Sequence, residues 1–276
     1  MSKERKTATA VLLKKSETDE GGWRLQTFGD SAETEYLEAK MNSEGSKHLA
    51  LFKYFKMELY RGGRRGQGGR KVDDVMADAV DGRVTLPLVY VVSLALAHIK
   101  AQIMDSLNKA DHVTLRTSDI RFVLTIPAIW SEFGKIFMRT AACRGGLTEY
   151  EHDHEVWFGT SSRVGTAEEA DGRERNREGK DILRTEGHTP YFPNFAFQRL
   201  TLCLEPEAAC LSVEADDAQP WEEGTQVMVL DCGGGTIDIT AHEVIKASPL
   251  ELKEVEEPTG GPWGSTIVDA KFKAFL

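Results

Sequence analysis

The chain has 276 residues, of which 41% are hydrophobic, so it can form one large domain or two modest ones. Its formal net charge of −10 and its pI of about 5.3 argue against a general nucleic-acid or membrane-surface binder. The four cysteines form no C-x-x-C pair and no apolar leader follows Met1, which favours reduced thiols and a cytoplasmic or nuclear location.

The first 60 residues predict two strands followed by two helices. Apolar patterning indicates strands at 7–13 and 23–28, then a short helix at about 33–40. The segment 48–60 predicts a second helix, because its apolar residues recur at helical spacing. Lys56 lies within this predicted helix.

An arginine- and glycine-rich run occupies residues 61–71. Such a run can bind nucleic acid, but it can equally be a flexible exposed loop. The loop is favoured because the run is short, lacks an aromatic residue for base stacking and belongs to an acidic chain.

The middle of the chain predicts a helix, a strand and a further helix. The apolar stretch 86–99 is too short to span a bilayer, so a buried helix is expected over 88–107. A buried strand at 122–126 stops at Pro127, and a helix over about 132–143 ends at two glycines.

Residues 148–200 differ from the rest of the chain. The part 168–180 is dominated by Glu, Asp and Arg without periodicity, so an irregular insert that packs little against the core is expected. His152 and His154 stand beside two acidic residues, but a metal site there is disfavoured because no second pair of ligands is nearby.

A strand from Leu200 runs into Glu205, and Pro206 opens the next helix, where proline is well tolerated. A carboxylate at such a junction either points into a cleft or interacts with the helix dipole. The acidic, glycine-rich loop about one strand later favours the cleft.

That loop, from Asp231 to Asp238, reads D-C-G-G-G-T-I-D and joins two predicted strands. Residues 233–235 lack Cβ atoms, so their backbone N–H groups can converge on an anion, and Thr236 adds a hydroxyl donor. Asp231 and Asp238 offer the hard oxygen ligands that Mg²⁺ prefers. Phosphate with Mg²⁺ is therefore the favoured ligand; the alternative is an ordinary glycine-rich hairpin turn flanked by acids.

The loop is neither a Walker A element nor a dinucleotide fingerprint, since a strand and not a helix follows it. Strands, helices and a glycine-rich hairpin in this order predict an α/β architecture with a mixed sheet. The chain closes on 259–266, T-G-G-P-W-G-S-T, and a further helix.

Three segments in order resemble the 70-kilodalton heat-shock chaperones of the actin-like ATPase superfamily. The segment 122–147 is similar to V-T-V-P-A…A-x-x-A-G-L, the segment 204–209 to N-E-P-T-A-A, and the segment 230–238 to D-L-G-G-G-T-x-D. The variants L-E-P-E-A-A, P-A-I-W, F-K-M and G-G-P-W-G-S-T look like the heat shock 70 kDa protein 12-like branch, which lacks the usual peptide-binding domain.

The resemblance implies a role for each matching residue. Lys56 and Glu205 would be catalytic, near the terminal phosphates, Mg²⁺ and the attacking water, while Asp231 and Asp238 would organise the metal. The remaining matches would bind the phosphates of ATP: Gly233, Gly234, Gly235, Thr236 and Gly264. The implied reaction is in-line attack of water on the γ-phosphate.

The resemblance also implies an incomplete actin-like ATPase (ribonuclease H-like) fold. No D-x-G-T-T of the first phosphate loop precedes Asp231, and the family continues well beyond Gly264. Residues 1–147 and 201–224 are expected to form most of lobe I, 148–200 an insert, and 225–276 the start of lobe II.

The expected function is that of an ATP-binding, chaperone-like ATPase domain with an incomplete nucleotide site. Its expected partners are ATP or ADP and client or regulatory proteins, with no nucleic acid and no membrane. The alternative is an interaction or scaffold protein that keeps the fold without turnover. The fragment as written is expected to have negligible ATPase activity.

Overall fold

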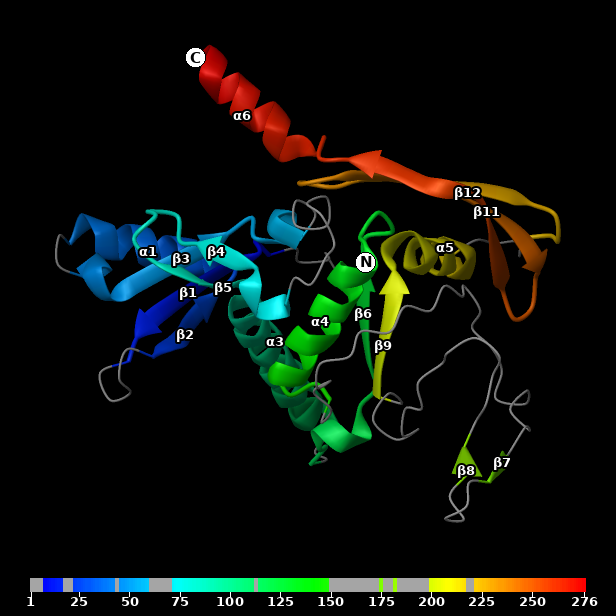
Figure 1. Cartoon of the computed structure of the whole chain (residues 1–276), viewed down its shortest axis with the longest axis horizontal. Helices are drawn as coiled ribbons and strands as arrows, with labels where there is room; N and C mark the ends of the chain where they lie inside the picture. The colour runs from blue at the N-terminus through cyan, green and yellow to red at the C-terminus, as the bar shows by residue number, and fades with distance from the viewer. Residues whose placement is uncertain are drawn as a thin grey trace.

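The computed structural model describes residues 7–16, 22–42, 45–59, 71–111, 114–148, 174–175, 181–182, 199–216 and 221–276. Most of the arginine–glycine run 61–71 and most of the insert 148–200 lie outside these residues. So do His152 and His154, for which the sequence disfavours a metal site. The described elements form a mixed α/β fold with several small sheets (Figure 1).

The N-terminal sheet has three antiparallel strands in the order β2-β1-β3. The strands are β1 (Ala10–Lys15), β2 (Trp23–Phe28) and β3 (Leu49–Lys53), and α1 (Asp30–Met41) with the 3₁₀ turn η1 (Gly45–His48) joins the last two. The helix predicted for 48–60 is therefore wrong over its first part. Among the described residues of this segment, 56–59 are α-helical.

Pairing with β1 explains this difference. Ala50 and Phe52 lie opposite Leu13 and Val11, and all four side chains are fully buried. A short apolar run can satisfy either a helix or a buried strand, so its partner decides the outcome.

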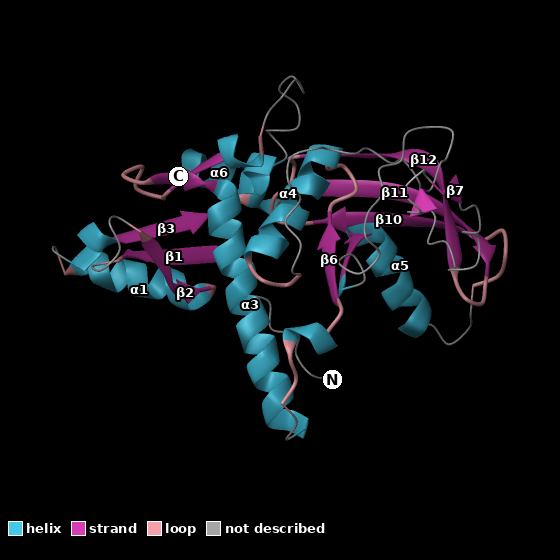
Figure 2. Ribbon diagram, turned by 60° about the horizontal axis from the view of Figure 1, so that its bottom comes forward, coloured by secondary structure: helices cyan, strands magenta, loops and turns pink. Residues whose placement is uncertain are grey.

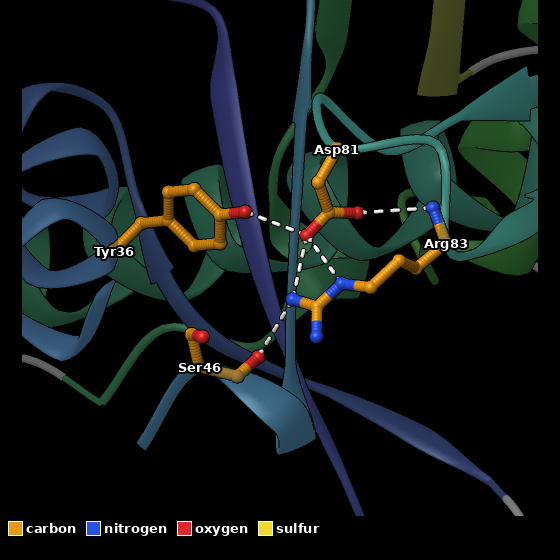
Figure 3. Close-up of polar contacts among 4 residues, drawn as sticks. All are labelled: Tyr36, Ser46, Asp81 and Arg83. Carbon is orange, nitrogen blue, oxygen red and sulfur yellow. Dashed lines mark hydrogen bonds and ion pairs between the residues drawn. The ribbon is translucent and has the colours of Figure 1, made fainter. Parts of the chain in front are cut away.

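A polar cluster joins α1 and η1 to the hairpin of β4 (Met76–Asp78) and β5 (Thr85–Pro87), which follows the 3₁₀ turn η2 (Val72–Asp74) (Figure 3). The Tyr36 hydroxyl donates to Asp81 Oδ2 at 2.6 Å, and Arg83 Nε donates to the same oxygen at 2.8 Å. Arg83 also donates to the Ser46 carbonyl at 3.0 Å. Burial raises the pKa of Asp81, but hydrogen bonds from Arg83 and Tyr36 outweigh it and lower the pKa to about 2.

Two helices cross the centre of the molecule: α3 (Leu88–Asp111) and α4 (Glu132–Arg144) (Figure 2). The 3₁₀ turn η3 (Thr117–Asp119) lies between them in sequence. Both helices form as the sequence predicts, and α3 begins in the core with Leu88, Val89 and Val91. By length and composition alone, residues 88–109 could cross a membrane, but a core helix passes the same test.

Two parallel strands, β6 (Phe122–Ile126) and β9 (Leu200–Leu204), are paired in register along their whole length. Helix α5 (Glu205–Asp216) follows β9 directly, as predicted. Parallel pairing brings the carboxyl ends of both strands to one edge, so Pro127, which follows β6, and Glu205, which begins α5, leave the sheet at the same edge.

The C-terminal sheet has the order β10-β11-β12. Its strands are β10 (Gln226–Cys232), β11 (Ile237–Lys246) and β12 (Glu251–Gly261), and helix α6 (Ser265–Phe275) projects from its end (Figure 1). A two-residue pair, β7 (Glu174–Arg175) with β8 (Asp181–Ile182), is described within the insert.

One main core joins the N-terminal sheet to the central helices and to the β6–β9 pair. Its fully or nearly fully buried members include Val11, Phe52, Leu88, Ile126 and Phe137. The C-terminal sheet contributes little to this core, and its strand β10 leaves Met228 and Leu230 exposed.

Candidate functional site

The hairpin turn between β10 and β11 places the two predicted metal-binding acids opposite each other. Asp231 pairs with Asp238 across the ladder, and Cys232 pairs with Ile237. The Gly233 N–H donates to the Thr236 carbonyl at 2.9 Å and closes the turn. Residues on opposite strands in register point to the same face of a sheet, so both carboxylates lie on one side of the hairpin.

That side of β11 is polar but buried, which the alternation of the sequence does not reveal. Asp238, Thr240 and His242 are each 3% exposed, whereas Ile237 and Ile239 are half-buried on the other face. The His242 ring nitrogen Nε2 lies 3.0 Å from Thr240 Oγ1. Polar residues are buried here because this side of the hairpin, and not the side with Ile237 and Ile239, faces the rest of the molecule.

Asp238 is the most constrained carboxylate of the hairpin. The Thr236 hydroxyl donates to Asp238 Oδ2 at 2.8 Å, while Oδ1 is buried with no hydrogen-bond partner among the described residues. Burial raises the pKa of Asp238; the hydrogen bond from Thr236 opposes this rise, and the charge of Asp231 adds to it. The charge of Lys56 and the backbone of Ile129 favour the ionised form.

Lys56 reaches the same region from the other end of the sequence. Its Nζ lies 2.7 Å from Glu205 Oε1 and 5.8 Å from the centre of the Trp130 ring. Tyr54 has a φ of 57°, a left-handed backbone conformation that turns the chain sharply between β3 and Lys56. Trp130 is nearly buried, and a Cβ on Gly134 would lie 3.2 Å from its ring, so the indole is held firmly in place.

The residue after Lys56 touches the glycine turn. A Cβ built on Gly235 would lie 2.6 Å from the Met57 sulfur, closer than real Cβ atoms approach. A side chain at this position would force the flexible end of Met57, next to Lys56, to move away from the turn.

The start of α6 packs against the same turn from another direction. The N–H groups of residues 264–266 donate to the three glycine carbonyls of residues 233–235, at 3.0 to 3.2 Å. The Thr266 hydroxyl also donates to the Gly234 carbonyl at 2.8 Å. A Cβ on Gly264 would lie 2.3 Å from that carbonyl oxygen, so only glycine fits there.

The structure thus brings together most of the residues predicted from the sequence. Lys56 contacts Glu205, Asp238 contacts Thr236, and the charges of Asp231 and Lys56 both act on Asp238. Gly264 lies against the backbone of the glycine turn. The sequence alone predicted no role for Trp130, Met57 or Thr266, although they lie in the motifs P-A-I-W, F-K-M and G-G-P-W-G-S-T.

The acidic side chains fit a magnesium ion only in part. No group of three His, Cys, Asp or Glu side chains in the described ranges is placed to hold a metal. Mg²⁺ is commonly bound by one or two carboxylates together with waters and phosphate oxygens, so the pair Asp231 and Asp238 matches that mode. The unpartnered Asp238 Oδ1 supplies a free ligand atom.

Chemically, the arrangement combines backbone amides in a glycine turn, a hydroxyl, two carboxylates and a lysine–glutamate pair. Amides and the lysine suit phosphate oxygens, and the carboxylates suit a divalent cation or a water molecule. These side chains come from β10, β11 and the turn between them, from the short helical turn after β3 and from the junction of β9 and α5.

No family model matches the chain. Among curated proteins it is 28% identical to human heat shock 70 kDa protein 12B over 284 aligned residues and 29% identical to human heat shock 70 kDa protein 12A over 278. Mouse heat shock 70 kDa protein 12A is also 29% identical, over 283 residues. Each alignment covers 98% of this chain but only 38% or 39% of the relative. This similarity confirms the resemblance drawn from the three ordered motifs.

Proposed function

We propose that the chain is part of an actin-like ATPase domain that binds ATP with Mg²⁺ at the β10–β11 turn. Residues 1–147 and 201–224 would belong to lobe I, and residues 225–276 would begin lobe II. The similarity to heat shock 70 kDa proteins 12A and 12B supports the ATPase-type domain, and a chaperone-type role in the cytoplasm is part of the same proposal. The chain spans 38–39% of the length of those relatives, so the activity of a whole protein of that length is a further proposal.

One observation carries the proposal: Lys56 and Glu205, 149 positions apart in sequence, form an ion pair beside the acids of the glycine turn. The Lys56 side chain is 49% exposed and that of Glu205 is 22% exposed, so the pair contributes little to stability. Charges gathered without a clear gain in stability indicate a ligand or a reaction.

In this proposal the amides of the turn and the Thr236 hydroxyl bind phosphate oxygens. Lys56 neutralises the terminal phosphate, and Glu205 orients the attacking water by accepting its hydrogen bond. Mg²⁺, when bound beside Asp231 and Asp238, would supply charge neutralisation to the phosphates. Positioning and electrostatics would then provide the rate enhancement, with no covalent intermediate.

A second candidate function is an interaction module without turnover. The exposed apolar side chains of the C-terminal part favour it; those exposed by more than half are Met228, Leu230, Trp263, Val268, Phe272, Phe275 and Leu276. Exposed apolar surface of this kind often marks a site of protein contact.

The proposed function is tested by titrating the chain with MgATP and measuring affinity by calorimetry and turnover by phosphate release. This chain alone is expected to show negligible turnover. In a longer chain that includes it and restores the flanking segments, Asp231→Asn and Lys56→Ala are expected to lower turnover more than affinity. A chain that binds a protein ligand but shows no response to MgATP would support the interaction module instead.

A further inference from the structure

The three carbonyls of the glycine turn all point toward the start of α6. The Ser265 N–H donates to the Gly233 carbonyl, the Thr266 N–H to that of Gly234, and the Gly264 N–H to that of Gly235. These bonds join segments about 30 residues apart, so the turn does not hold this shape by itself.

Because the peptide bond is planar, the direction of each carbonyl also fixes the direction of the next amide N–H. In a trans peptide the C=O of one residue and the N–H of the next point in opposite directions, and the bonds of this turn are trans. Because the carbonyls of 233–235 point to α6, the N–H groups of 234–236 point away from it. None of these three N–H groups donates a hydrogen bond within the described chain.

Three successive N–H groups on one side of a turn form an anion-binding nest. From this geometry we propose that α6 is the positioning element of the phosphate turn, with Thr266 as its principal side chain. Thr266 holds the central carbonyl twice, through its N–H at 3.0 Å and its hydroxyl at 2.8 Å. It acts through the turn and touches no phosphate itself. This inference rests on the proposed function for the identity of the anion.

The contact also couples the nest to an exposed helix. In α6 no residue is buried, and Val268 and Phe272 are more than half exposed. An anion that fixes the nest therefore also fixes the orientation of α6, and a partner that moves α6 releases the nest.

The test compares Thr266→Val, which removes the hydroxyl, with Thr266→Ser, which keeps it, in the ¹⁵N-labelled full chain. Hydrogen exchange at the amides of Gly264 and Ser265 reports the contact without ligand. Amide shifts of residues 234–236 during titration with magnesium pyrophosphate report the nest. A single hydrogen bond contributes about 0.5–1.5 kcal/mol, so Thr266→Val is expected to weaken pyrophosphate binding roughly 3- to 10-fold and to speed exchange similarly. Thr266→Ser is expected to stay within about twofold of the wild type.

Equal behaviour of both variants overturns the proposal. If both match the wild type, the hydroxyl holds nothing, and if both are equally impaired, the hydroxyl alone does not support the turn. Impairment of Thr266→Ser alone would show that the methyl, which valine retains, supports the turn. Should Thr266→Val fail to fold, Ser265→Pro removes one amide donor at the first helical position, where proline is accepted. Wild-type exchange at the Gly264 amide together with wild-type binding in that variant would equally overturn the proposal. A third outcome separates the two proposals. If exchange is faster in Thr266→Val, but the amides of the wild-type chain do not shift with MgATP or pyrophosphate, the proposed function is refuted and the positioning contact stands.

Discussion

Lys56 Nζ lies 2.7 Å from Glu205 Oε1, and the Trp130 ring lies 5.8 Å from the same nitrogen. The three residues come from the turn after β3, the junction of β9 and α5, and the loop between β6 and α4. An ammonium group between a carboxylate and an aromatic face has its position fixed on two sides. The lysine is therefore held ready beside the glycine turn before any ligand binds.

The Lys56–Glu205 pair is expected to matter for ligand binding and little for stability. In a double-mutant cycle with Lys56→Met and Glu205→Gln, urea denaturation should give a coupling of about 0.2–1 kcal/mol, because the pair is solvated. The exposed ion pair Lys246–Glu251 is a matched control, for which a similar coupling free energy is expected. Only the first cycle should change MgATP affinity, and an equal change in the control cycle would contradict the prediction.

The two close approaches to the glycine turn predict different tolerance to alanine. At Gly264 the added Cβ meets backbone, 2.3 Å from the Gly234 oxygen, whereas at Gly235 it meets the flexible end of Met57. Gly264→Ala should therefore lower the free energy of unfolding by roughly 1–3 kcal/mol, as overpacking does, and Gly235→Ala by less. Adding Met57→Ala should offset part of the Gly235→Ala loss but none of the Gly264→Ala loss, as measured by thermal unfolding.

The surroundings of Asp238 predict that replacing it stabilises the ligand-free chain but weakens ligand binding. Its carboxylate is 3% exposed, one oxygen has no partner in the described chain, and burial raises its pKa. Asp238→Asn is expected to stabilise the ligand-free chain by about 1 kcal/mol, because it removes an incompletely compensated charge. The same variant should lose the stabilisation that Mg²⁺ with ATP gives the wild type. Asp231→Asn, at a half-buried position, should stabilise less; a destabilised Asp238→Asn variant would refute this view.

The cluster of Tyr36, Asp81 and Arg83 predicts a loss of stability in acid. The pKa of Asp81 is about 2 in the folded chain, below its ordinary value, so its contribution is fully present above about pH 4 and is lost as the pH falls toward 2. The difference in free energy of unfolding between wild type and Asp81→Asn should shrink over that range. Asp105→Asn, in an exposed pair with Lys109, is the control and should show almost no difference at any pH.

The same cluster predicts the opposite trend in base. Burial, and then the hydrogen bond to Asp81, raise the pKa of Tyr36 above 10. The folded state therefore binds the phenolic proton more tightly than the unfolded state, and its contribution is lost as the pH rises through the raised value. Tyr36→Phe removes this dependence, at a cost of about 0.5–1.5 kcal/mol near neutral pH. Urea denaturation between pH 8 and about 11 measures both effects.

Where the signal is local, the sequence predicts the structure well. The hairpin around residues 233–235, the strand ending at Pro127 and the helix after Glu205 all form as expected, because glycine, proline and apolar alternation act over a few residues. The segment 49–53 could not be assigned this way, since its apolar residues fit a helix or a strand until β1 supplies a partner.

By itself, the sequence determined which residues we propose to carry the chemistry: the acids and glycines of the turn, Lys56 and Glu205. Only the tertiary structure decided their surroundings. It buries the polar face of β11 and not the apolar one, pairs Lys56 with Glu205, and ties the glycine carbonyls to α6. The physical reason is that burial and hydrogen-bond partners depend on contacts between distant segments. No local pattern encodes which segment will supply them.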